Sequence, residues 1–150
     1  MTLFPPRLRP LVRLLWYWLP PLIVMAAIFY ASSRSSLPQA EGEWLDAFLK
    51  KVAHVAEYTL LFVLLVRAWS LHLLPLAACR AGWLTTLAYG ISDEIHQSFV
   101  PRRHANWYDV VIDVAMPLLL CFLYTSAVRR GRGFRWARWL FHRQDGNLPE

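Results

Sequence analysis

The sequence predicts an all-α membrane protein, a four-transmembrane-helix bundle with both termini in the cytoplasm. Hydrophobic residues make up 57% of the 150 residues and charged residues only 17%. Four apolar runs approach the roughly 20 residues that cross a bilayer as a helix. The spans are expected at residues 12–31, 51–70, 74–92 and 108–128. They leave too little chain for a second folded unit, so residues 1–150 are interpreted as one domain.

The first span is predicted from Leu14–Ala31, which carries no charged side chain. Three arginines precede it, as in the basic region of a cleaved signal peptide, which is the alternative interpretation. The length of the apolar run, together with Trp16 and Trp18, favours a retained span. Pro20 and Pro21 lie inside the run and are expected to kink the helix, because proline lacks the amide donor.

The other three spans each tolerate one charged residue. The second run, Val55–Val66, is apolar apart from one glutamate. The third, Leu74–Ile91, holds one arginine, and the fourth, Val110–Val128, holds one aspartate. Nothing in the positions of Cys79 and Cys121 indicates a disulfide or a cysteine metal site.

The distribution of arginine and lysine predicts the orientation. With the N-terminus inside, about 11 basic residues fall on the inner side and about 5 on the outer side, which agrees with the positive-inside rule. The protein is therefore expected to be a multi-pass membrane protein with both termini in the cytoplasm. The tail, 129–150, mixes arginine with aromatic residues, and either binds anionic lipid head groups or is a plain stop-transfer anchor. Nucleic acid is not expected as a partner.

A polar stripe opens the second span. It consists of Lys51, His54, Glu57 and Tyr58, which fall within about a third of the helix circumference. Val52, Val55, Phe62 and Val63 fall mostly elsewhere. The stripe should therefore face the bundle or a wet cavity. Glu57 is a functional candidate because a carboxylate inside a membrane is costly. The alternative is a structural ion pair with Lys50 or with an arginine of another helix.

Two further polar stripes lie on the same side of the predicted membrane. One ends the third helix and carries Tyr89, Asp93 and Gln97, with Glu94 beside them. Pro101 should end this helix before Arg102 and Arg103. The other stripe opens the fourth span with Asn106, Asp109 and Asp113. Each has an ordinary reading, as a solvated helix end or a helix-start acid, but acids at a helix C-terminus oppose the helix dipole and need a nearby cation. Together the three stripes predict an outward-facing polar pocket.

These stripes resemble the motifs of the VanZ-like family of bacterial membrane proteins. "KVAHVAEYTLLFVLL" is similar to its lysine-histidine-tyrosine motif, "YGISDEIHQSFVPRRHANWYDVVID" resembles its second motif, and "YASSRSSLP" fits its serine-rich exit from the first span. The family's polar signature falls on Lys51, His54, Tyr58, Asp93, Glu94, Gln97, Pro101, Arg102 or Arg103, and Asp109. The chain departs from the family at Asp113 and Met116, where asparagine and glycine are usual.

The resemblance implies a four-helix, multi-pass protein of the bacterial inner membrane. The founding member is associated with lowered susceptibility to the glycopeptide teicoplanin, without remodelling of the peptidoglycan precursor. The resemblance supplies no biochemical activity, so the function is argued from the pocket.

The leading hypothesis is that the pocket engages a membrane lipid, a lipid-linked envelope intermediate or a lipophilic glycopeptide. Lys51, Arg102 and Arg103 would hold a phosphate or carboxylate of the ligand. Trp44, Trp107 and Tyr108 would lie at the level of the lipid head groups. The full set of expected ligand-binding residues is Lys51, His54, Tyr58, Asp93, Glu94, Gln97, Arg102, Arg103, Asp109 and Asp113.

Two alternatives use the same side chains differently. A membrane-embedded hydrolase or transferase of phospholipid-like substrates would draw its catalytic groups from His54, Asp93 and Glu94. Asp93, Glu94 and Asp109 could then hold a divalent cation as cofactor. The sequence contains no HExxH, GxSxG or P-loop motif. An ion-coupled transporter would use Glu57 and Asp113 as carriers and, with only four helices, would need to form an oligomer.

Overall fold

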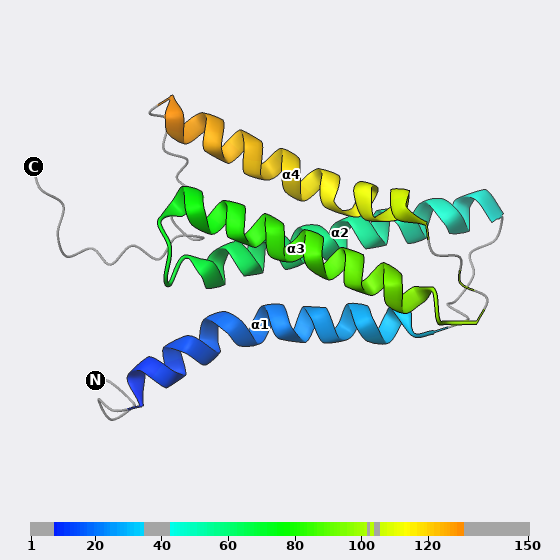
Figure 1. The fold of residues 1–150 in the computed structure, drawn as a ribbon, viewed down its shortest axis with the longest axis horizontal. Helices are drawn as coiled ribbons and strands as arrows, with labels where there is room; N and C mark the ends of the chain where they lie inside the picture. The colour runs from blue at the N-terminus through cyan, green and yellow to red at the C-terminus, as the bar shows by residue number, and fades with distance from the viewer. Residues whose placement is uncertain (1–7, 35–42, 102, 104–105, 131–150) are drawn as a thin grey trace, which may run out of the picture.

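The computed structural model describes residues 8–34, 43–101, 103 and 106–130. Within these residues the chain forms α-helices and no β-strand. The helices are α1 (Arg9–Ser32), α2 (Glu43–Trp69), α3 (Pro75–Gln97) and α4 (Trp107–Arg129). Successive helices run in opposite directions (Figure 1). For the residues that the structure describes, the prediction of an all-helical fold with four helices is therefore confirmed.

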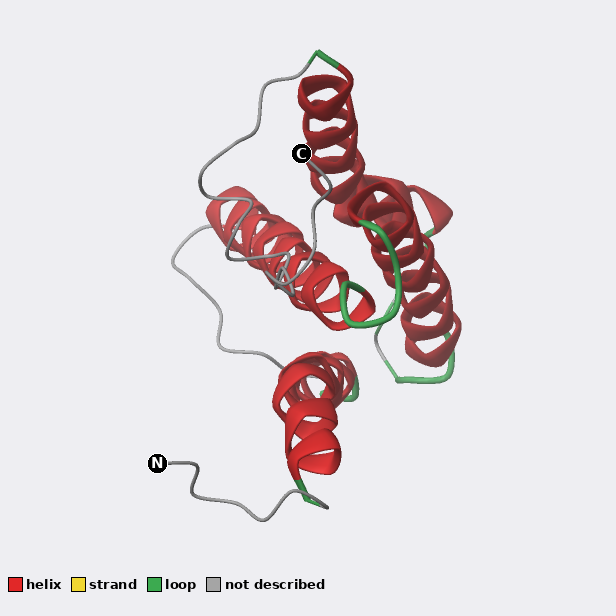
Figure 2. Cartoon of the chain, turned by 90° about the vertical axis from the view of Figure 1, so that its left-hand side faces the viewer, coloured by secondary structure: helices red, strands yellow, loops and turns green. Residues whose placement is uncertain are grey.

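Three segments are long and apolar enough to cross a membrane: Arg9–Ser32, Phe48–Trp69 and Trp107–Ala127. They correspond to the first, second and fourth predicted spans. α3 is not among them, and its predicted span stays a prediction. Small and polar residues such as Gly82, Thr85 and Thr86 interrupt its apolar run and lower its hydropathy. α1 and α4 lie on opposite sides, with α2 and α3 between them (Figures 1 and 2).

The first helix packs along one face and only in part. Its buried residues are Tyr17, Pro21, Ile28 and Ser32, spaced by four, seven and four residues. Residues 8–16 have no buried side chain, so the N-terminal turns of α1 lie away from the bundle. Pro20 and Pro21 lie inside the helix, and Figure 1 shows α1 bending along its length, as proline predicts.

The central contact of the bundle depends on small residues of α3. Ala78, Gly82, Thr86 and Gly90 recur every fourth residue, and all four are buried. A Cβ atom on Gly82 would lie 2.6 Å from the Val66 Cγ2 atom and 3.0 Å from the Val66 backbone nitrogen. Small residues at this spacing let two helix backbones approach closely in a membrane. The closeness of α2 and α3 then brings their polar ends into contact.

Apolar side chains fill the space around this contact in two clusters. One joins α2, α3 and α4 through Phe62, Val66, Cys79, Cys121 and Tyr124. The other joins α1 and α2 through Ile28, Tyr58, Leu61 and Leu65. The placement of Phe62 away from the polar stripe is wrong. It follows Tyr58 by one helical turn, and both side chains point into the bundle.

The two cysteines are free thiols in the first of these clusters. The Sγ atoms of Cys79 and Cys121 lie 3.0 Å apart, between α3 and α4. Nothing in the sequence indicated that these thiols meet, because their proximity depends on how the two helices are turned about their axes.

Candidate functional site

α1 and α3 end, and α2 and α4 begin, at the same end of the bundle (Figure 1, right-hand side). Polar side chains of all four helices meet there. At the centre is Asp93 of α3, which is only 3% exposed. Its Oδ2 atom accepts hydrogen bonds from Ser32 Oγ at 2.9 Å, Tyr58 OH at 3.1 Å and Gln97 Nε2 at 2.9 Å. Three helices thus hold one buried carboxylate, which limits its freedom to move.

Tyr58 reaches Asp93 because α3 has a glycine beside it. A Cβ atom on Gly90 would lie 3.3 Å from the Tyr58 ring, so the ring can lie against the helix backbone. Tyr89 packs near the same ring, and its hydroxyl donates a 2.6 Å hydrogen bond to the Met25 carbonyl of α1. The two tyrosines therefore fix α1, α2 and α3 relative to one another at the depth of Asp93.

Three successive polar positions of α2 each face a carboxylate of another helix. Lys51 forms an ion pair with Asp109 of α4. One turn deeper, the Nδ1 atom of His54 lies 3.7 Å from the Oδ2 atom of Asp113. One turn deeper again, Tyr58 donates to Asp93. The polar stripes of α2, α3 and α4 therefore meet in one row, which runs from the exposed helix ends into the bundle.

Two buried atoms of this row have no hydrogen-bond partner among the described residues. They are Oδ1 of Asp93 and Nδ1 of His54. The 3.7 Å separation from Asp113 is too long for a hydrogen bond. An unsatisfied buried polar atom costs about 1–3 kcal/mol. A buried polar atom without a partner therefore needs an explanation, and a bound ligand that forms a hydrogen bond with it would provide one.

Glu94 and Arg103, two other predicted site residues, connect the ends of neighbouring helices through hydrogen bonds. Glu94 Oε1 accepts a 2.5 Å hydrogen bond from the backbone nitrogen of Asn106, which ties the end of α3 to the start of α4. Arg103 donates to the backbone carbonyls of Arg34 at 3.3 Å and Ala31 at 3.4 Å. These carbonyls lie at the C-terminal end of α1, where a cation suits the helix dipole. Arg102 lies outside the described residues.

Two details differ from the expectations drawn from the sequence. Glu57 is partly exposed and makes no ion pair with Lys50 or with any other described residue. His96 carries contacts that the sequence did not indicate. Its ring stacks on Phe29, with centroids 4.2 Å apart, and its Nε2 atom lies 3.0 Å from Ser33 Oγ. A histidine one position before Gln97 could have been placed beside α1 only if the rotation of both helices were known.

No metal centre is evident in the described part of the chain. It contains no group of three or more His, Cys, Asp or Glu side chains that could hold a metal ion. Asp93, Glu94 and Asp109 have separate partners: three neutral donors, a backbone amide and Lys51. The divalent cation and the catalytic roles of His54, Asp93 and Glu94 stay predictions.

These features define a helical membrane protein with a polar cluster at one end of its bundle. A family model described as VanZ/LLP1 matches residues 14–129, which include all four helices almost completely. The chain therefore belongs to the VanZ/LLP1 family. No curated protein and no solved structure matches it.

Proposed function

We propose that the polar cluster binds the polar part of a lipid, a lipid-linked envelope intermediate or a lipophilic glycopeptide at the outer face of the bacterial inner membrane. The observation that carries this proposal is the state of Asp93. Three helices fix its carboxylate through Oδ2, while its buried Oδ1 has no partner among the described residues. A rigid acceptor with unused capacity is suited to a ligand that donates hydrogen bonds.

A membrane ligand would approach along exposed aromatic side chains. Trp107 and Tyr108 are exposed at the start of α4, and Trp44 is exposed at the start of α2. Tryptophan and tyrosine are enriched at the level of lipid head groups, where one part of the ring is apolar and another is wet. These residues would hold the head group of the ligand at the level of the cluster.

An anionic ligand group would have to compete with groups of the protein. Lys51 is paired with Asp109, and Arg103 donates to the end of α1. The Lys51–Asp109 pair is the easier one to open, because both side chains are partly exposed and such pairs contribute at most about 1 kcal/mol. The proposal therefore assigns anion binding to Lys51 and a structural role to Arg103.

Substitutions of the ion pair test this assignment. Lys51→Gln is expected to weaken binding of polyprenyl diphosphate by about 10- to 100-fold, because a charge-assisted hydrogen bond contributes roughly 1.5–3 kcal/mol. Asp109→Asn should strengthen binding by up to about fivefold, because Lys51 no longer has to leave its partner. Binding is measured with the full chain in lipid nanodiscs, with teicoplanin as a second probe and Lys50→Gln as the control. Unchanged affinity for both probes in both variants would refute the proposal.

The proposed orientation is tested by labelling from outside the cell. In a Cys79→Ser, Cys121→Ser background, a cysteine replaces either Trp44 at the start of α2 or Leu74 before α3; both positions are exposed in the bundle. A membrane-impermeant maleimide added to spheroplasts should label the first variant and spare the second until the membrane is opened. Labelling of the Leu74 variant alone in intact spheroplasts would show that the protein has the opposite orientation.

A further inference from the structure

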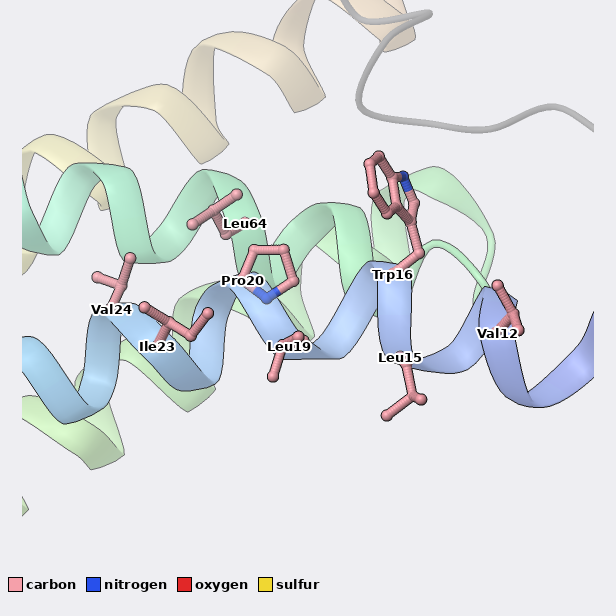
Figure 3. Close-up of a pocket in the computed structure, with 8 residues that line it drawn as sticks. All are labelled: Val12, Leu15, Trp16, Leu19, Pro20, Ile23, Val24 and Leu64. Atoms are coloured by element: carbon pink, nitrogen blue, oxygen red, sulfur yellow. The ribbon is translucent and has the colours of Figure 1, made fainter.

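A separate feature lies at the opposite end of the bundle, where α1 diverges from α2. Apolar side chains line a groove of about 510 Å³ there, and almost no polar atom faces it. The lining comes from α1, with one contribution from α2: Val12, Leu15, Trp16, Leu19, Pro20, Ile23, Val24 and Leu64. Figure 3 shows Pro20, Val24 and Leu64 between the two helices, with Trp16 further toward the N-terminus.

We propose that this groove binds one acyl chain of an anionic phospholipid, whose phosphate is held by Arg9 and Arg13. This inference does not depend on the proposed function, because it concerns the other end of the bundle. It commits to a phospholipid of the leaflet in which α1 begins.

The dimensions of the groove fit an acyl chain. From Val12 to Val24 the groove follows twelve residue steps of α1, or about 18 Å at 1.5 Å per residue. One leaflet contributes about half of the roughly 30 Å hydrocarbon core. The groove is therefore about as long as an acyl chain that extends from the head group toward the bilayer centre. Its volume also falls within the range of roughly 300–1,000 Å³ that is usual for ligand pockets.

Two arginines at the N-terminal end of the groove fit a phosphate. Arg9 precedes Trp16 by seven residues and Ile23 by fourteen, so the three lie in one line along the helix. Arg13 follows Arg9 by one turn, next to Val12 of the lining. Each basic residue near a membrane surface attracts anionic lipid, and arginine can bind a phosphate through two parallel hydrogen bonds.

The prolines explain why the groove exists. Pro20 and Pro21 break the hydrogen-bond ladder of α1 and allow its first turns to leave the bundle. The chain's own tail, 129–150, is a less suitable occupant. It carries many arginines, which would lie beside Arg9 and Arg13 and be repelled by them.

The test measures lipid binding to the purified full chain by native mass spectrometry, with phosphatidylglycerol and phosphatidylethanolamine as probes. The wild-type chain should bind phosphatidylglycerol about fivefold more tightly than phosphatidylethanolamine. Arg9→Gln with Arg13→Gln should reduce this preference to less than about twofold. Arg80→Gln removes an exposed arginine near the same end of the bundle and should leave the preference unchanged.

A second pair of variants tests the groove itself. Ile23→Trp should fill it and lower the affinity for phosphatidylglycerol about fivefold. Leu119→Trp adds the same bulk to an exposed site of α4 and should have no effect. Phosphatidylglycerol with brominated acyl chains should also quench tryptophan fluorescence more in the wild-type chain than in Trp16→Phe. This measurement does not depend on a bulky substitution that could unfold the protein.

Three results would overturn the inference. The first is an equal loss of preference in Arg80→Gln and in the double arginine variant. The second is unchanged affinity in Ile23→Trp. The third is cross-linking that places the tail in the groove of the lipid-free and lipid-loaded protein alike.

Discussion

Asp93→Ala is expected to lower the free energy of unfolding by about 3 kcal/mol, the largest effect of any single polar substitution at the site. The change removes the acceptor of Ser32, Tyr58 and Gln97 and leaves three buried donors without it. A buried donor that loses its partner costs about 1–3 kcal/mol, while interhelical hydrogen bonds in membranes average only about 0.6 kcal/mol. The measurement is equilibrium unfolding by detergent titration in bicelles.

Two matched substitutions make this result interpretable. Asp109→Ala also removes a carboxylate, but its partner Lys51 is partly exposed, so a loss below about 1 kcal/mol is expected. Asp93→Asn keeps one acceptor oxygen and should lie between the two alanine variants. If Asp93→Ala were as stable as Asp109→Ala, the carboxylate would not be the point that joins the three helices. Because Asp93→Asn should lose less stability than Asp93→Ala, a loss of ligand binding in Asp93→Asn can be distinguished from a loss caused by unfolding.

Gly82→Ala is expected to destabilise the bundle by about 2 kcal/mol or more. The added Cβ would lie 2.6 Å from a methyl group of Val66 and 3.0 Å from its backbone nitrogen, so α2 and α3 would have to separate. Overpacking a well-packed contact usually costs about 1–3 kcal/mol, and backbone atoms yield less easily than side-chain ends. Unfolding in bicelles again provides the measurement.

The neighbouring glycine and the opposing valine serve as controls. The Cβ atom of Gly90→Ala would lie 3.3 Å from the Tyr58 ring and at an ordinary contact distance of 3.7 Å from the Val110 Cγ1 atom, so this change should cost less than about 1 kcal/mol. Val66→Ala removes the methyl group that clashes, so the double variant Gly82→Ala, Val66→Ala should lose less stability than the sum of the two single changes. If the stability losses of the two single variants simply added in the double variant, contact with the Val66 methyl group would not be the reason why Gly82→Ala is destabilising.

The helices could be predicted from hydropathy because long apolar runs have few other interpretations. Their limits were less accurate. α2 begins at Glu43, eight residues before the predicted span, because its first turns mix charged and apolar residues and are still helical. α3 continues to Gln97, five residues beyond the predicted span, so Asp93 and Gln97 lie on the helix itself. Hydropathy locates the part of a helix that lipid surrounds, whereas helix ends depend on local backbone bonding.

The candidate site was predicted in its composition and less well in its pairing. Helical periodicity correctly grouped Lys51, His54 and Tyr58 on one side of α2 and Asp109 with Asp113 on one side of α4. The involvement of Ser32 could not be predicted from periodicity. It joins the site from α1 because that helix ends at the depth of Asp93, which depends on how α1 packs against α3. Spacing within one helix gives a face, but the rotation and depth of its neighbours come from packing.

The bundle and the site depend on the same interactions. Glycines of α3 bring α2 close, and Tyr58 can then donate to Asp93 while its ring contributes to the apolar core. The second of these glycines lies one turn before Asp93, so packing and polar contact are coupled over a few residues. Substitutions that loosen α2 against α3 should therefore weaken ligand binding even where no polar side chain is changed.

The most direct test of the proposed function is a structure of the full chain determined with native lipids retained. The account predicts density for a polar head group between α2, α3 and α4, within hydrogen-bonding distance of Asp93 or His54 and next to Lys51. Trp107 and Tyr108 should lie at the level of that head group. A well-ordered structure in which this end of the bundle is closed by protein side chains alone, with lipid bound only elsewhere, would contradict the account.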